Sequence, residues 1–177
     1  MTERMTELGF KAADIKALDI NPFKNIGDRW MLITAGNEND SNTMTASWGG
    51  LGVMWGKNVA IAVIRPQRYT KKFVDEQESF TLSFYPDDKK PALSYCGSHS
   101  GKDMAKGEKA AAAGLTPLYV DGTVAYEEAD MILVCKKLYE APVDPKGFAD
   151  ESLIAKWYPD SDFHEAYVAE ITAVYTK

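Results

Sequence analysis

The feature that most limits the possible folds is a series of short strand-like segments separated by small helices. Each segment is rich in β-branched and aromatic residues and is bounded by turn residues. The segments are Arg29–Ala35, Thr43–Trp48, Val59–Ile64, Ser79–Tyr85, Thr123–Tyr126, Met131–Leu138 and Ala166–Tyr175. A parallel sheet would need a crossover helix after nearly every strand, and no such regular alternation occurs. The pattern therefore predicts a mainly β protein, a barrel with helical insertions.

Two of these segments also indicate how they are buried. Val59–Ile64 is continuously apolar, which is typical of a strand buried on both faces. Ser79–Tyr85 alternates instead, with Phe80, Leu82 and Phe84 on one face. We therefore expect one strand in the middle of the fold and one with a single apolar face.

The segments between the strands predict short helices. These are expected at Lys71–Gln77 with Thr70 as the cap, and at Lys89–Tyr95, Gly107–Ala113 and Asp144–Trp157. Residues 1–20 are expected to form an extended entry and a short turn. Asn21-Pro22 is expected to interrupt regular structure.

Length and charge limit the class of protein. The 177 residues suit a single domain spanning 1–177. The formal charge of −6 argues against nucleic acid or an anionic membrane as a partner. Cys96 and Cys135, the only cysteines, have no CxxC spacing and no secretory signal before them, which indicates reduced thiols. No apolar run is long enough to span a bilayer. We therefore expect a cytoplasmic protein.

The stretch Asn42–Gly56 has an unusual composition for a packed strand. It contains two tryptophans, Trp48 and Trp55, two methionines and four glycines. Its small residues Thr45-Ala46-Ser47 leave backbone amides uncovered. Glycine allows close approach of backbone to a ligand, and aromatic rings form apolar walls. We therefore interpret the stretch as a site for a flat, partly apolar ligand.

Two further stretches favour a phosphate on that ligand. Arg65–Lys72 contains four cations and no carboxylate, and Lys71 and Lys72 fall in the first helical turn, where the macrodipole disfavours them. A bound anion would reconcile these features, although a solvated face with a helix cap remains the alternative. Cys96–Lys102 offers hydroxyls, mobile amides and a lysine, the materials of a phosphate-binding turn.

Several other sites are not supported. Gly97 and Gly101 are one residue too close for a P-loop, and Asp103 stands where Ser or Thr should follow the lysine. No GxGxxG occurs for a dinucleotide fold, and no GxSxG for a hydrolase. His99 and His164 have no Cys/His cluster near them, so no metal site is expected.

Read in order, five motifs resemble the flavin reductase-like proteins, the FMN-binding split-barrel group that includes flavoredoxin-like proteins. The resemblance covers roughly residues 20 to 175. Its motifs are Asn42–Gly49, Ile64–Thr70, Phe80–Phe84, Ser100–Asp103 and His164–Ile171. The last motif departs from the family pattern, because Ala169 stands where a glycine is usual.

The resemblance implies a Greek-key split barrel with short helices around it, which forms a homodimer with FMN near the interface. The backbone of Thr45, Ala46 and Ser47 would face the polar edge of the isoalloxazine ring, with Met44 and Trp48 close by. The residues implied near the phosphate are Arg65, Arg68, Tyr69, Thr70, Ser98, Ser100 and Lys102. His164 would approach from the dimer side, near the nicotinamide of a donor.

The function expected from this resemblance is an NAD(P)H-dependent FMN oxidoreductase that passes electrons to an acceptor. The cofactor supplies the chemistry, and the protein orients it, with His164 as a proton donor or nicotinamide contact. A non-enzymatic FMN-binding electron carrier or flavin carrier is the alternative, because both need the same pocket. A barrel without cofactor and a relative acting on pyridoxamine phosphate also stay open, although the motif order fits flavin reductases better.

Overall fold

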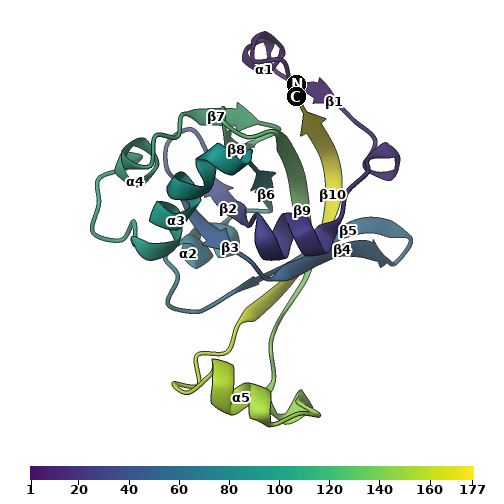
Figure 1. Ribbon diagram of the computed structural model, residues 1–177, viewed down its shortest axis with the longest axis vertical. Coiled ribbons are helices and arrows are strands. Elements are labelled where there is room, and N and C mark those ends of the chain that lie inside the picture. Colours follow the sequence, from purple (N-terminus) through teal and green to yellow (C-terminus); the bar gives the residue numbers. More distant parts are fainter.

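A computed structural model describes residues 1–177 and contains one large antiparallel sheet with short helices packed around it (Figure 1). The main sheet follows the order β3-β2-β6-β9-β10-β5-β4, and β1 pairs with β10 at its end. Its strands are β1 (Lys11–Ala12), β2 (Met31–Gly36), β3 (Ser41–Ala46), β4 (Gly49–Met54), β5 (Lys57–Ile64), β6 (Ser79–Phe84), β9 (Met131–Pro142) and β10 (Glu165–Thr176). A separate hairpin consists of β7 (Pro117–Val120) and β8 (Thr123–Tyr126). The expected mainly β class is confirmed.

The two longest strands, β9 and β10, join the halves of the sheet. They pair along their whole length, with irregular register between Val168 and Ala169 and again between Ile171 and Ala173. Such bulges bend a strand and increase its twist, which lets one strand serve two parts of a closed sheet. β10 also pairs with β5 and with β1. Both strands extend further than the sequence predicted, and Figure 1 shows them running from the chain termini toward the opposite end of the molecule.

Alternating side chains of the central strands enter two separate hydrophobic cores. Ile33 of β2 and Leu82 of β6 belong to a core of 20 buried residues. Leu32, on the other face of β2, belongs to a core of 17, to which α3, β7 and β8 also contribute. β6 is therefore buried on both faces and not on one, because β8 covers the second face and accepts a hydrogen bond at Val124 from the Thr81 hydroxyl, 2.7 Å long.

The helices are short and lie outside the sheet. They are α1 (Glu3–Glu7), α2 (Thr70–Glu76), α3 (Lys90–Ser98), α4 (Glu108–Ala112) and α5 (Ser152–Trp157). Short 3₁₀ turns occur at Ile15–Ala17, Asp87–Lys89 and Pro145–Gly147, and Phe23–Asp28 is π-helical. None of the helices has the length and apolar character needed to cross a membrane.

Three expectations about these helices were wrong. The entry segment contains α1 and not only extended chain. Pro22 does not interrupt regular structure but precedes the π-helical segment, at a position where its missing N–H is not needed. The long helix expected at Asp144–Trp157 is divided, because Asp144 caps only a 3₁₀ turn and Asp150 starts α5 separately by accepting a bond from the Ser152 amide.

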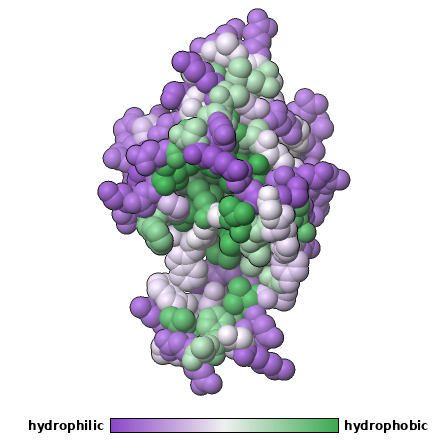
Figure 2. All heavy atoms as spheres, turned by 90° about the vertical axis from the view of Figure 1, so that its right-hand side faces the viewer, coloured by the Kyte–Doolittle hydropathy of each residue, from purple (hydrophilic) through white to green (hydrophobic).

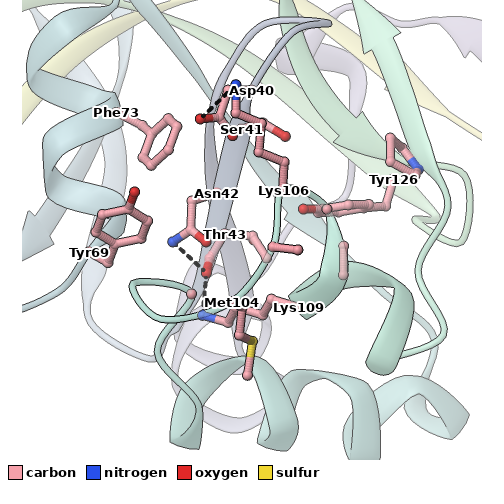
Figure 3. Close-up of a pocket in the computed structure, with 15 residues that line it drawn as sticks. Asp40, Ser41, Asn42, Thr43, Tyr69, Phe73, Met104, Lys106, Lys109 and Tyr126 are labelled. Carbon is pink, nitrogen blue, oxygen red and sulfur yellow. Dashed lines mark hydrogen bonds and ion pairs between the residues drawn. The ribbon is translucent and has the colours of Figure 1, made fainter.

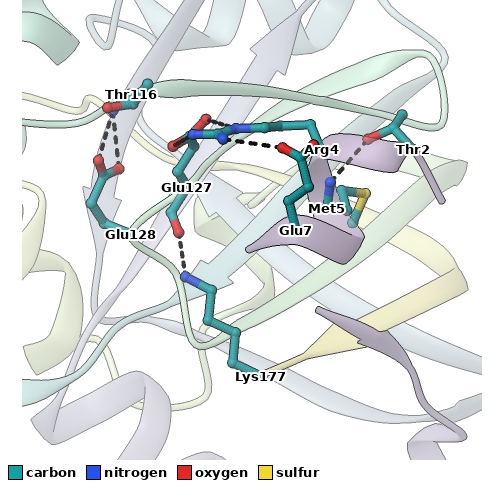
Figure 4. Close-up of polar contacts among 8 residues, drawn as sticks. All are labelled: Thr2, Arg4, Met5, Glu7, Thr116, Glu127, Glu128 and Lys177. Atoms are coloured by element: carbon teal, nitrogen blue, oxygen red, sulfur yellow. Dashed lines mark hydrogen bonds and ion pairs between the residues drawn. The ribbon is translucent and has the colours of Figure 1, made fainter. Parts of the chain in front are cut away.

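Contacts of α1 hold the two chain ends together. Arg4 donates to both carboxylate oxygens of Glu127 at 2.7 Å, and the Lys177 ammonium donates to the Glu127 carbonyl (Figure 4). The Thr2 hydroxyl caps the helix by accepting a bond from the Met5 amide. The N- and C-termini therefore lie side by side, as Figure 1 shows.

Residues 143–164 form a lobe at the opposite end of the molecule, between β9 and β10 (Figure 1). α5 lies in this lobe and buries none of its side chains. Inside the lobe Phe148, Tyr158 and Phe163 form a small cluster in which the last two rings stack 4.6 Å apart. The lobe thus has little core of its own, and its contacts with the barrel matter for its position.

Candidate functional site

A pocket of about 340 Å³, which we call the aromatic pocket, lies where the lobe meets the barrel. The end of β3, the end of β5, α5 and the residue before β10 form its walls. Its lining residues are Met44, Thr45, Ala46, Ser47, Trp48, Val63, Arg65, Arg68, Trp157 and His164. The fold thus brings together eight of the residues singled out in the sequence.

Three rings form one wall of the aromatic pocket. Trp48 meets Trp157 edge to face with ring centroids 5.0 Å apart, and its centroid lies 5.1 Å from that of His164. The Trp48 side chain reaches this wall from the connection between β3 and β4. The connection is short because Gly49 adopts a φ of +144°, where an added Cβ would lie 2.5 Å from the Ile61 carbonyl oxygen. This geometry explains one glycine of the glycine-rich stretch.

The backbone beside these rings offers free donors. β3 stops pairing with β2 at Ala46, so Ser47 and Trp48 lie outside the ladder. The amide N–H groups of Ser47 and Trp48 have no acceptor within the chain. The Thr45 hydroxyl is not free, because it donates to the Leu93 carbonyl in α3. The pocket therefore combines apolar walls with unpaired backbone amides at one edge.

His164 is nearly buried at the lobe side of the pocket. Its Nδ1 lies 2.8 Å from the Tyr158 hydroxyl. Burial, and to a smaller extent the nearby Arg65 charge, lower the pKa of His164. The imidazole is therefore neutral at pH 7. Because burial also raises the pKa of Tyr158, this hydroxyl keeps its proton and can donate to Nδ1, which leaves the imidazole proton on Nε2.

Arg65 connects the lobe to the barrel. Its guanidinium pairs with the Asp162 carboxylate and donates to the Trp157 carbonyl at 2.7 Å. Gln67 donates to the same carboxylate at 2.6 Å. Arg65 therefore lies in the aromatic pocket, apart from Thr70 and the serines that the sequence grouped with it.

A second pocket of about 210 Å³, which we call the polar pocket, adjoins the first, because Arg68 lines both. It lies between the start of α2 and the end of α3. Its lining residues are Asn42, Gln67, Arg68, Tyr69, Thr70, Gly97, Ser98, His99, Ser100 and Lys109. Five of these were singled out in the sequence. Gly97 of α3 faces Thr45 of β3, where an added Cβ would be in ordinary contact at 3.4 Å.

Two cations of the polar pocket, the half-buried Arg68 and the buried Lys109, have no carboxylate partner. Arg68 donates to the Gly97 carbonyl at 3.0 Å, and the Lys109 ammonium donates to the Thr43 carbonyl at 2.7 Å. Burial lowers the pKa of Arg68, and it lowers that of Lys109 to about 8. Buried charges are normally paired, so this arrangement has room for an anion.

The local structure differs from the expected phosphate-binding turn. Cys96, Gly97 and Ser98 form the last turn of α3. Lys102 does not line the polar pocket but faces an open groove with Lys71 and Lys72. Thr70 does not cap α2; it is the first residue of that helix, and its hydroxyl accepts a bond from the Asn42 side-chain amide at 2.8 Å.

Trp55 is also absent from both pockets. It stands with Gly56 at the turn between β4 and β5, and both have positive φ, as a two-residue hairpin turn requires. Its side chain is 61% exposed and lies 6.3 Å from the Tyr139 ring. The glycine-rich stretch is therefore an edge strand and its turn, of which only the start contributes to the site.

Several pocket residues were not foreseen from the sequence. They are Asn42, Val63, Gln67, Gly97, His99, Lys109 and Trp157. Asn42 and Gln67 lie within motifs that were recognised, so their position next to assigned residues was a usable signal. Lys109 stands among alanines in a short helix, a pattern that suggests a solvated lysine. No group of three His, Cys, Asp or Glu side chains is arranged to hold a metal, and both cysteines are free and buried.

Comparison with known proteins agrees with this architecture. A family model described as a flavin reductase like domain matches residues 23–177. The chain is similar to the FMN-binding domain of a flavin reductase-like enzyme from Shewanella baltica OS155, with a TM-score of 0.67, 14% identity and coverage of 94% of this chain and 76% of that one. For the flavoredoxin of Methanosarcina acetivorans the values are 0.64, 19%, 93% and 76%.

A Shewanella frigidimarina protein described as a flavin reductase with a split barrel domain is similar over 92% of this chain and 77% of its own, with a TM-score of 0.65 and 17% identity. No curated protein matches the sequence. The fold is thus a split barrel with two adjoining pockets at the edge of its sheet. Because the family model matches most of the chain, the protein belongs to the flavin reductase-like family.

Proposed function

We propose that the protein is an FMN-binding oxidoreductase of the flavin reductase type. The flavin ring would occupy the aromatic pocket, and the phosphate would occupy the polar pocket. The observation that supports this most directly is that an aromatic-walled pocket adjoins, through the shared Arg68, a pocket in which Arg68 and the buried Lys109 have no carboxylate partner. FMN has the same division into a flat ring and a phosphate.

The donor groups present fit this cofactor. The free amides of Ser47 and Trp48 suit the polar edge of the ring, together with the backbone from Met44 to Ala46. Arg68 and Lys109 suit the phosphate. Further hydroxyl and amide groups nearby belong to Asn42, Tyr69, Thr70, Ser98 and Ser100. When bound, FMN would supply the capacity to accept a hydride and release electrons.

The residues of the chain would contribute orientation, electrostatics and exclusion of water. Trp48 and Trp157 cover one side of the pocket and limit access of water there. Amide N–H groups aimed at the ring edge stabilise negative charge that develops on it. His164 would hold a proton on Nε2, with its orientation fixed by Tyr158. Arg65 holds the lobe and so keeps Trp157 in place.

We propose that NADH or NADPH donates electrons, which pass through FMN to an acceptor. The rival function is a non-enzymatic FMN-binding carrier, which the similarity to a flavoredoxin favours. Both functions require FMN binding, which a titration of the purified protein with FMN, followed by flavin fluorescence, tests. Oxidation of NADH and NADPH, followed by nicotinamide absorbance with several acceptors, then separates the two functions. Flavin binding without nicotinamide oxidation would leave the carrier function.

We also propose that the protein is a homodimer. The turn between β4 and β5 exposes Val53 by 70% and Trp55 by 61%, and Tyr139 of β9 lies next to Trp55. Figure 2 views the molecule from this side, and hydrophobic residues gather across its middle among hydrophilic ones. A contiguous exposed apolar area is typical of a protein interface.

We propose further that residues 1–177 form one domain. We also propose that the protein resides in the cytoplasm, and the two free, buried cysteines support this location.

A further inference from the structure

Lys109 is a lysine built into the wall of the polar pocket. Its side chain is only 5% exposed, and its ammonium has one acceptor in the chain, the Thr43 carbonyl at 2.7 Å. An ammonium has three donors, so two remain for a ligand. The ion pairs of the chain all lie elsewhere, and neither Lys109 nor Arg68 takes part in one.

The neighbouring loop holds the lysine in this position. Figure 3 shows Lys109 reaching the Thr43 carbonyl beside the Asn42 side chain. Gly101 packs against Asn42 and Lys109. A Cβ added at Gly101 would lie 2.3 Å from the Asn42 side-chain oxygen and 3.6 Å from Lys109 Cδ. A side chain at residue 101 would have to displace the Asn42 amide, which donates to the Thr70 hydroxyl. Lys109 is therefore held inward by its bond to Thr43 and by the loop that packs over it.

No group that faces Lys109 supplies the missing negative charge. Burial raises the pKa values of Cys96 and Tyr126, so both are neutral near pH 7. The residues that line the polar pocket include no aspartate or glutamate. Asp40 is occupied by Lys106, whose ammonium lies 3.7 Å away.

We propose that Lys109 binds the phosphate of the flavin and that this phosphate is its counterion, an inference that rests on the FMN-binding function proposed above. Arg68 would bind the same group, since both line the polar pocket. A phosphomonoester with its second pKa near about 6 is a dianion above neutral pH, which matches two cations. Lys102, the lysine that the sequence favoured, lines an open groove that adjoins the polar pocket at Arg68 and does not line the pocket itself.

This arrangement makes flavin binding depend on pH. Burial lowers the pKa of Lys109 to about 8 in the free chain, and a dianion beside it favours the charged form. Above about pH 8, binding must therefore be accompanied by uptake of a proton at Lys109, and affinity for FMN falls as pH rises. Cys96 and Tyr126 stay neutral on both sides of this step, and the phosphate is already a dianion.

Replacement of Lys109 by methionine tests the inference. Methionine keeps the length and apolar packing of the side chain but removes the charge. In titrations at pH 7.0, we expect Lys109→Met to weaken FMN binding roughly 10- to 100-fold and to change riboflavin binding by less than about threefold, because riboflavin has no phosphate. Lys106→Met is the matched control. Lys106 lies in the loop just before α4, outside the polar pocket, and its replacement should change neither affinity.

A second measurement uses the unaltered protein and does not depend on the folding of a variant. Calorimetric titrations at pH 8.5 in two buffers of different ionisation enthalpy should show proton uptake with FMN and none with riboflavin. Unchanged FMN affinity in Lys109→Met, or no proton uptake with FMN, would overturn the role of Lys109 while leaving FMN binding intact. If the unaltered protein bound neither flavin, the proposed function would fail as well.

Discussion

Trp157 joins the lobe to the barrel at the level of a single side chain. Its ring meets Trp48 at a centroid distance of 5.0 Å, and its carbonyl accepts a hydrogen bond from Arg65. The side chain belongs to α5, which buries no residue. Trp157 thus lines the aromatic pocket from an element that has no packing of its own, so the pocket depends on the position of the lobe.

We predict that Trp157→Ala weakens the binding of both FMN and riboflavin, by roughly tenfold, because the contact concerns the ring and not the phosphate. Trp55→Ala is the matched control, since Trp55 is exposed and lies outside both pockets. Fluorescence titrations with both flavins measure the effect. A loss restricted to FMN would contradict a ring contact at this position.

His164 offers a second prediction at this scale. Its pKa is lowered by burial, so the imidazole is neutral over the physiological range. The Tyr158 hydroxyl fixes the tautomer and the orientation of the imidazole through Nδ1. If His164 contributes a proton from Nε2, Tyr158→Phe should therefore lower the turnover rate, because the ring is no longer held in that state. His164→Ala should lower it at least as much. Stopped-flow measurement of flavin reduction by NADPH or NADH tests both, and unchanged hydride transfer in His164→Ala would remove the proton role.

The sequence foretold the residue types of the site better than their exact positions. Residues close in sequence to a strand end, such as Thr45 and Trp48, could be assigned because a strand that stops pairing leaves its next residues at the rim. Lys109 could not be preferred to Lys102, because it stands among alanines in a short helix and only the tertiary fold turns it inward. Trp157 is distant in sequence, and nothing local indicates that it meets Trp48.

At the scale of elements, β4 shows that a glycine-rich segment can form a strand. It lies at the edge of the sheet and pairs only with β5, so its glycines do not leave holes in a core. The composition alone suggested the opposite, because glycine weakens a packed strand. The long helix expected before the last strand did not form, because the lobe has only a small aromatic cluster and α5 buries no side chain against it.

The glycines of β4 are predicted to differ in their tolerance of a side chain. Gly49→Ala would force φ of +144° on alanine and place its Cβ 2.5 Å from the Ile61 carbonyl oxygen. We expect a loss of at least about 1–3 kcal/mol in the free energy of unfolding. Gly52→Ala should be nearly neutral, because no atom lies within 4 Å of the added Cβ and its φ is ordinary. Denaturant unfolding of the two variants measures the difference, and equal losses would contradict the close approach at Gly49.

The contact between the lobe and the barrel is predicted to depend on Asp162. Hydrogen bonds from Arg65 and then Gln67 lower the pKa of Asp162, so this contact is complete above the ordinary aspartate range and is lost only as pH falls below it. Asp162→Asn should therefore speed amide exchange and proteolysis in residues 143–164 at pH 7, with little change in the main unfolding transition. Asp160→Asn, in the same lobe without such partners, is the control. Equal protection in both variants would mean that other contacts hold the lobe.

At the scale of the whole molecule, the long strands β9 and β10 connect three regions: the chain termini, the two cores and the lobe. The sequence located β10 to within one residue at each end but ended β9 at Leu138 and not at Pro142, because the outer half of β9 is largely exposed and lacks the apolar pattern of its inner half. The exposed aromatic residues of the β4–β5 turn and of β9 lie together only because the sheet brings these elements to one side.

This exposed area leads to the last prediction, which concerns assembly. If Val53, Trp55 and Tyr139 form the centre of a dimer interface, Trp55→Lys should place a charge in an apolar contact and halve the mass measured by sedimentation at micromolar concentration. Tyr119→Lys is the control, since this exposed aromatic lies on the separate β7–β8 hairpin. Both positions are solvent-exposed in the single chain, so neither variant should lose stability as a monomer. A dimer that survives Trp55→Lys, or that Tyr119→Lys dissociates equally well, would locate the interface elsewhere on the barrel.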